Sequence, residues 1–96
     1  EENSMGVYLK DPQARLDYAI DWQENLSGAT IAESRWAVTP EEPGGVRASA
    51  SFREDGRTAV TLEGGIAGRV YRVANTITRS DGREDARSLL IRAEAR

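Results

Sequence analysis

The chain reads Leu16-Asp17-Tyr18-Ala19-Ile20-Asp21-Trp22 near its start, and this stretch decides the fold prediction. Its large apolar residues occupy every second position, and two aspartates stand between them. Because side chains alternate between the two faces of a strand, this spacing puts the apolar residues on one face and the carboxylates on the other. A helix would bring the aspartates onto the apolar face. The stretch therefore predicts a half-buried β-strand.

The same alternation continues toward the C-terminus and predicts further strands over residues 30–38, 46–53, 60–63, 71–77 and 84–93. The pairs Asp55-Gly56 and Asp81-Gly82 are typical of tight hairpin turns. Residues 39–45 form a loop, because their prolines and glycines interrupt strands and helices alike. No segment keeps helical spacing over three turns. Six short strands separated by such turns predict an all-β sandwich or a small barrel.

The segment around Tyr71 favours the sandwich. Leu62 ends one strand, Gly64-Gly65 and Gly68 follow, and Tyr71 opens the next strand three residues after Gly68. This resembles the tyrosine corner of immunoglobulin and fibronectin type III domains, where the phenol bonds back to the crossing backbone. We therefore expect an Ig-like or fibronectin type III-like β-sandwich of six or seven antiparallel strands. Val7-Tyr8-Leu9 would supply the additional strand, and the expected core aromatics are Trp22, Trp36, Phe52 and Tyr71.

The composition excludes several kinds of site. The 96 residues contain no histidine and no cysteine, so neither a Ser–His–Asp triad nor a zinc site with imidazole or thiolate ligands can form. The acidic loops at residues 54–57 and 80–85 lack the spacing of a calcium loop and are interpreted as turns. We expect no enzyme, no catalytic residue, no metal, no cofactor and no small-molecule substrate.

The net charge and the hydropathy of the chain limit the kinds of partner that it can bind. The formal net charge of −3 argues against nucleic acid, and no apolar run approaches the roughly 18 residues that span a bilayer. Residues 1–6 are expected to form an N-terminal tail, of which residues 1–4 are a remnant before a natural start at Met5. Residues 7–96 are expected to form a single β-sandwich domain.

Between about residues 10 and 91 the chain resembles a group of small proteins encoded by tailed bacteriophages and prophages. The motifs that carry the resemblance are Lys10-Asp11-Pro12, Leu16-Asp17-Tyr18 with Asp21-Trp22, Gly28-Ala29-Thr30-Ile31, Trp36-Ala37-Val38, Gly68-Arg69-Val70-Tyr71 and Ser80-Asp81-Gly82-Arg83. The resemblance implies a structural or decoration component of the virion, made in the bacterial cytoplasm, with an Ig-like fold. Its partners would be other virion proteins, and it supplies no catalytic residues.

The predicted topology also gives a candidate interface. It places residues 46–53 in one sheet with the strands of residues 30–38, 71–77 and 84–93. The outer face of that sheet would present Arg35, Arg47, Arg72, Leu90 and Arg92. Arginine is enriched at protein interfaces, and the opposite sheet, which bears Asp17 and Asp21, is more acidic. Head-to-tail self-association is then one expectation.

Two other readings stay open at this point. In one, both faces are plain solvated surfaces, and the arginines protect exposed strands from unwanted pairing. In the other, the chain is a recognition module that binds a host-surface polysaccharide or an adhesin partner.

Overall fold

The computed structural model describes residues 4–95, and within them it contains seven strands and one short helix. In chain order the elements are β1 (Ser4–Lys10), β2 (Leu16–Asp21), α1 (Gln23–Leu26), β3 (Ile31–Thr39), β4 (Arg47–Glu54), β5 (Arg57–Glu63), β6 (Val70–Arg79) and β7 (Glu84–Ala93). The predicted all-β sandwich is confirmed, and the strand expected at residues 7–9 is part of β1. The helix α1 was not predicted. The interpretation of residues 1–4 as a remnant concerns residues that, except for Ser4, lie outside the described range.

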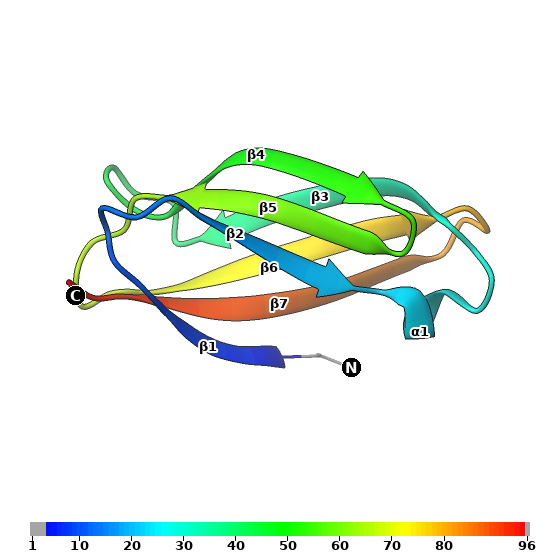
Figure 1. The fold of residues 1–96 in the computed structure, drawn as a ribbon, viewed down its shortest axis with the longest axis horizontal. Coiled ribbons are helices and arrows are strands. Elements are labelled where there is room, and N and C mark those ends of the chain that lie inside the picture. The colour runs from blue at the N-terminus through cyan, green and yellow to red at the C-terminus, as the bar shows by residue number, and fades with distance from the viewer. Residues whose placement is uncertain (1–3, 96) are drawn as a thin grey trace.

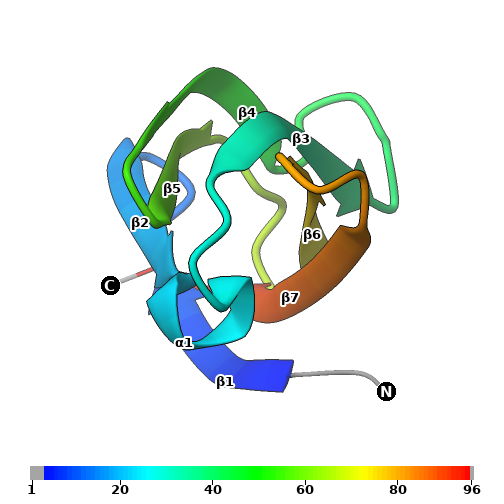
Figure 2. The same cartoon turned by 90° about the vertical axis from the view of Figure 1, so that its right-hand side faces the viewer.

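The strands form two sheets that pack face to face (Figures 1 and 2). The four-stranded sheet has the order β1-β7-β6-β3, and the three-stranded sheet has the order β2-β5-β4. β1 runs parallel to β7, and the remaining paired strands are antiparallel. Figure 2 looks along the sandwich, with β3 and β4 side by side at the top and with β1 and α1 at the bottom.

β4 lies in a different sheet from the one expected. The prediction placed residues 46–53 beside β3, β6 and β7, whereas β4 pairs with β5 in the three-stranded sheet. The reason is the turn between β4 and β5. It consists of Asp55-Gly56 alone, and Gly56 has a φ of +72°, which glycine adopts without steric cost. So short a connection makes two successive strands hydrogen-bonded neighbours in one sheet.

The core lies between the sheets. Its largest fully buried apolar side chains are Ile20, Trp22, Val60, Leu62, Tyr71, Val73, Ile77 and Ile91. The expected burial of Trp22 and Tyr71 is confirmed, since both side chains are 0% exposed. Trp36 is only half-buried at the margin of the core. The expected burial of Phe52 is wrong, because this side chain is 54% exposed.

A β-bulge in β4 explains why Phe52 points outward. The pairing of β4 with β5 shifts between residues 48 and 50. Before the shift, Ala48 lies opposite the buried Leu62, and after it Ser51 lies opposite the buried Val60. An extra residue in one strand moves every following side chain to the other face. The alternation that begins at residue 46 is therefore reversed by residue 52, and Phe52 faces solvent.

A hydrogen-bonded cluster of polar side chains crosses the core. The indole Nε1 of Trp22 donates to Thr58 Oγ1 at 3.0 Å and to Asn75 Oδ1 at 3.1 Å. The Thr58 hydroxyl also donates to Asn75 Oδ1, at 2.7 Å. Asn75 Nδ2 donates to Ser34 Oγ and to the Arg35 carbonyl, both at 2.9 Å. Because Asn75 belongs to β6 and Thr58 to β5, the cluster links the two sheets through satisfied polar groups.

Two arginines hold α1 against one end of the sandwich. Arg79, from β6, donates to the backbone carbonyls of Asn25 at 3.1 Å and Leu26 at 2.9 Å. Arg87, from β7, donates to the side-chain oxygen of Asn25, and its guanidinium carbon lies 4.8 Å from the ring centroid of Trp22. Carbonyls at the end of a helix lack partners within it. The guanidinium of Arg79 supplies partners for two of those carbonyls, and together with Arg87 it fixes the connection from β2 to β3.

Candidate protein interface

The outer face of the four-stranded sheet carries four of the five residues expected at the interface. Residues of β6 that point into the core alternate with residues that point outward. Among the latter, Arg72 lies opposite Leu90 of β7, and Arg92 of β7 lies opposite Val70. Arg35 of β3 is on the same face, because its neighbours on either side point toward the core. The structure therefore brings Arg35, Arg72, Leu90 and Arg92 onto one surface.

Four apolar side chains gather at one end of this face. Val7 and Leu9 come from β1, Val70 from β6 and Leu90 from β7. Val7 lies opposite Leu90, while Leu9 and Val70 both lie opposite Arg92, so the four occupy two neighbouring rows. Val7 is 60% exposed, Val70 49% and Leu9 47%, whereas Leu90 is half-buried. We call these four residues the apolar patch. Exposed apolar side chains that gather on one surface are typical of binding sites.

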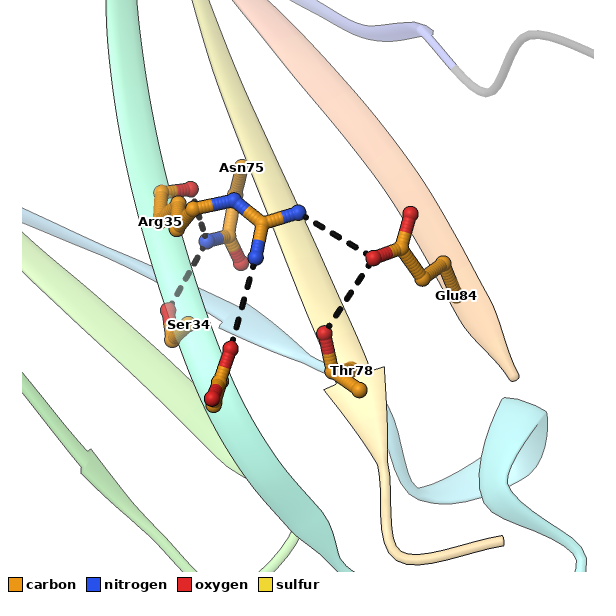
Figure 3. Close-up of polar contacts among 6 residues, drawn as sticks. Ser34, Arg35, Asn75, Thr78 and Glu84 are labelled. Atoms are coloured by element: carbon orange, nitrogen blue, oxygen red, sulfur yellow. Dashed lines mark hydrogen bonds and ion pairs between the residues drawn. The ribbon is translucent and has the colours of Figure 1, made fainter. Parts of the chain in front are cut away.

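Beyond the apolar patch the face carries small side chains and then charged ones. Next to the apolar patch it carries small side chains, namely Ala37, Ala74, Thr76, Ala86 and Ser88. At the far end Arg35 lies 3.5 Å from Glu33 and 3.4 Å from Glu84. Figure 3 shows the contact between Arg35 and Glu84. The hydroxyl of Thr78 also donates to Glu84, at 3.4 Å (Figure 3).

Arg35 and its two ion-pair partners lie at the end of the face away from the apolar patch. The three charged side chains are each more than half exposed, and exposed pairs contribute little to stability. Their charges nevertheless compensate one another on the sheet. The apolar patch, and not the guanidinium of Arg35, is thus the feature that distinguishes this face from an ordinary solvated one.

Arg47 does not belong to this surface. It lies in β4, on the three-stranded sheet, opposite Glu63 and 3.1 Å from its carboxylate. The expected grouping of Arg47 with Arg35, Arg72 and Arg92 is wrong for the same reason that placed β4 in the other sheet. The short hairpin keeps β4 with β5.

The two sheets also differ less in charge than the sequence suggested. On the four-stranded sheet Arg92 lies 3.4 Å from Glu94. On the three-stranded sheet Glu63 is paired with Arg47 and, at 3.3 Å, with Arg15. Each sheet therefore presents charges of both signs. Self-association through a basic and an acidic face stays a prediction.

Sequence reasoning missed three members of the apolar patch. Val7 and Leu9 flank Tyr8, so the alternation of residues 7–9 already placed them on one face, but nothing in it showed that β1 joins β7. Val70 directly precedes the buried Tyr71, and its outward direction follows from strand parity once β6 is known to begin at Val70. The signal for Val70 was present in the sequence.

Metal and membrane sites were also sought in the described part of the chain. Between residues 4 and 95, no three His, Cys, Asp or Glu side chains come together in a way that would hold a metal ion. The helix found there, α1, has four residues and is far too short to cross a bilayer.

The fold places the chain among small two-sheet β-sandwich proteins, with an apolar patch on one outer face. Residues 10–92 match the family described as podophage GP4 fiber-tail adaptor protein gp77. The match spans most of the chain, and the chain belongs to this family. It is therefore a structural component of a tailed bacteriophage, as the resemblance implied. A comparison with curated proteins gave no match.

The family match covers two of the four residues of the apolar patch. It begins at Lys10, the last residue of β1, and continues into β7. It therefore includes Val70 and Leu90 of the apolar patch, whereas Val7 and Leu9 precede it.

Proposed function

We propose that this chain joins a fibre to the tail of a podophage particle by protein–protein contacts and catalyses no reaction. The family description supports this role, since it names a fibre–tail adaptor. The apolar patch is the observation that carries the proposal, because three of its side chains are about half exposed or more. Burial of such side chains against a partner drives association, at roughly 25 cal/mol per Å² of apolar surface.

Arg72 and Arg92 give the apolar patch the polar groups that a protein partner would contact. Both lie among its apolar members, with Arg72 opposite Leu90 and Arg92 opposite Val70. Protein interfaces commonly combine an apolar centre with arginines that bond to the partner's carboxylates or carbonyls. We therefore place the docking of one folded virion protein on the apolar patch, with Arg72 and Arg92 as its polar contacts. Arg35 lies at the margin of this surface.

We further assign the sandwich to the constant-type immunoglobulin-like arrangement. In that arrangement strands B, E and D form one sheet, and strands C, F and G form the other. The order β2-β5-β4 opposite β3, β6 and β7 follows this scheme, with β1 added beside the last strand. A fibronectin type III arrangement would need β4 beside β3. Superposition of an experimental structure on domains of both kinds tests the assignment.

The role is tested with particles that lack this protein. The phage gene is deleted, and the chain is supplied from a plasmid as wild type, as Leu90→Glu or as the double variant Val70→Glu/Leu90→Glu. A carboxylate in the patch opposes its burial in an interface, so we expect wild type to restore fibres on the tail and the double variant to restore few or none. Electron microscopy counts the fibres, and adsorption to host cells gives a second readout.

Thr30→Glu is the matched control for Leu90→Glu, because it adds the same charge at an exposed loop position beside Ser80, at the other end of β6 from Val70. Circular dichroism and thermal melting of each purified variant establish that it folds. Particles that carry fibres without this protein would overturn the proposed role. Full restoration by the folded double variant would overturn the patch as the docking surface.

A further inference from the structure

The flank of the sandwich where β3 and β4 meet is hollowed. β3 is the last strand of the four-stranded sheet and β4 the last strand of the three-stranded sheet, and the two lie side by side without pairing (Figure 2). We call this line of contact the seam. A larger hollow of about 420 Å³ is lined chiefly by Trp36 and Val38 from the β3 side and by Val46 and Ala48 from the β4 side. A smaller one of about 150 Å³ is lined by Ser34, Ser51, Phe52 and Arg53.

Small side chains on β4 leave the seam open. All eight residues of β4 are exposed, and the central ones, Ala48 to Ser51, are alanines and serines. They do not cover the opposite wall, so Trp36 and Val38 remain half-buried. The indole Nε1 of Trp36 is buried without a hydrogen-bond acceptor among the described residues. An apolar side chain from a partner would complete the burial of this wall.

Backbone groups along the seam suit an extended ligand. β3 and β4 each end their sheet, so one edge of each has no neighbouring strand in the described chain. Edges of this kind bind extended segments, whose backbone supplies the missing hydrogen bonds and whose alternate side chains enter pockets. Ser34, Trp36 and Val38 follow one another at every second position of β3. They cover about 13 Å, the length of about four extended residues.

One charged side chain at each hollow indicates which way round an extended ligand would lie along the seam. Glu41 lines the larger hollow and Arg53 the smaller one. Neither has an ion pair within residues 4–95, unlike Arg47, which is paired with Glu63. A bound segment with a cationic side chain near Glu41 and a carboxylate near Arg53 would satisfy both groups.

We propose that the seam binds an extended segment of one of the two proteins that this chain joins. The segment places an apolar side chain in the larger hollow, with a lysine or arginine beside Glu41. An aspartate or glutamate about four residues away contacts Arg53. This inference rests on the proposed adaptor role. It gives the chain a second contact on a different side from the apolar patch, which a protein that joins two partners requires.

The test uses the folded 96-residue chain and short overlapping peptides that cover the fibre and tail proteins of the same phage. Each peptide carries a fluorescent label, and binding is measured by anisotropy. We expect at least one peptide with the stated charge pattern to bind. Ala48→Trp fills the larger hollow and should weaken that binding by about tenfold or more. Arg53→Glu should weaken it less, and by a factor that shrinks as salt rises.

Controls separate the seam from other surfaces. Arg83→Glu makes the same charge change in an exposed loop. Ala86→Trp makes the same alanine-to-tryptophan change on the outer face of the four-stranded sheet, and neither substitution should alter peptide binding. Ala48 is exposed, so its replacement leaves the core intact. Absence of binding by every peptide at up to about 1 mM would refute the seam as a binding site. So would binding that Ala48→Trp leaves unchanged.

The particle assay described under the proposed function distinguishes failure of the seam inference from failure of the adaptor role. If particles without the chain lose their fibres, but Ala48→Trp restores them as well as wild type does, the seam inference fails and the adaptor role stands. If those particles keep their fibres, the adaptor role itself fails.

Discussion

The hydroxyl of Tyr71 accepts a hydrogen bond from the backbone N–H of Ile66 at 3.0 Å. Ile66 lies in the connection that crosses from β5 to β6, where the sequence predicted such a bond, and that prediction is confirmed. The same hydroxyl donates to the carboxylate of Glu42 at 2.8 Å. Since the ring of Tyr71 is fully buried, one side chain ties the core to two connecting loops. Burial and the neighbouring Glu42 carboxylate raise the pKa of this phenol, although the Ile66 bond opposes them.

Replacing Tyr71 by phenylalanine should therefore destabilise the fold while leaving the apolar packing in place. The change leaves the Ile66 N–H and the Glu42 carboxylate without their partner, at a cost of about 1–2 kcal/mol in the free energy of unfolding. Urea denaturation measures the difference. Tyr18→Phe is the matched control, since the Tyr18 hydroxyl makes no hydrogen bond in the described structure. Equal effects of the two substitutions would contradict the importance of the corner.

The buried amide of Asn75 gives a second prediction. Its side-chain oxygen accepts hydrogen bonds from Trp22 and Thr58. Its side-chain nitrogen donates to Ser34 and to the backbone carbonyl of Arg35. Asn75→Ala leaves several of these groups buried and unpaired, so we expect a loss of about 3 kcal/mol in the free energy of unfolding. Thr76→Ala, one residue later on the outer face, should change stability by less than about 0.5 kcal/mol. A loss at Asn75 no larger than that of the control would show that the cluster is not needed.

Much of this architecture was visible in the sequence because strand periodicity is local. The alternation in residues 16–22 and 71–77 gave the strands and the buried faces, including Trp22 and Tyr71. The same rule failed at Phe52, because one inserted residue in β4 reverses the faces beyond it. A bulge depends on how two strands pair, and the composition of residues 46–53 carries no sign of it.

The placement of the candidate interface residues on one face was predicted in part for a related reason. Which residues point outward follows from parity, and Arg72, Leu90 and Arg92 were correctly placed on one face. Which strands are neighbours depends on long-range pairing. Two strand pairings therefore had to come from the structure. The pairing of β1 with β7 completes the apolar patch, and the pairing of β4 with β5 removes Arg47 from the outer face of the four-stranded sheet.

The guanidinium of Arg87 yields a third prediction. It stacks on the ring of Trp22 and donates to the carbonyl of Asp21 at 2.8 Å and to the side chain of Asn25. Lysine keeps the charge but cannot stack as a plane or donate in a fork, so Arg87→Lys should cost about 1–2 kcal/mol in the free energy of unfolding. Hydrogen exchange should also show faster opening of α1. Arg83→Lys, in an exposed turn, should have neither effect, and an unchanged exchange rate at α1 in Arg87→Lys would count against the role of the guanidinium.

The carboxylate of Glu63 makes the stability of the sandwich depend on pH. The polar hydroxyl of nearby Ser49 is the first cause that lowers the pKa of Glu63 below its ordinary value of 4.5, and the guanidinium groups of Arg15 and Arg47 add to it. A group whose folded pKa lies below its unfolded one stabilises the fold above the unfolded pKa, and this contribution is lost as the pH falls through the folded pKa. Glu63→Gln should therefore lower the urea midpoint at pH 7, and the difference from wild type should shrink once the pH falls below about 4.5. Added salt should reduce the difference at pH 7, because the two guanidinium groups are exposed.

Glu41→Gln removes an exposed carboxylate that has no ion pair in the described chain and is the charge-matched control. A wild-type minus Glu63→Gln difference that stays constant from pH 7 to pH 3 would mean that the carboxylate does not act through its charge.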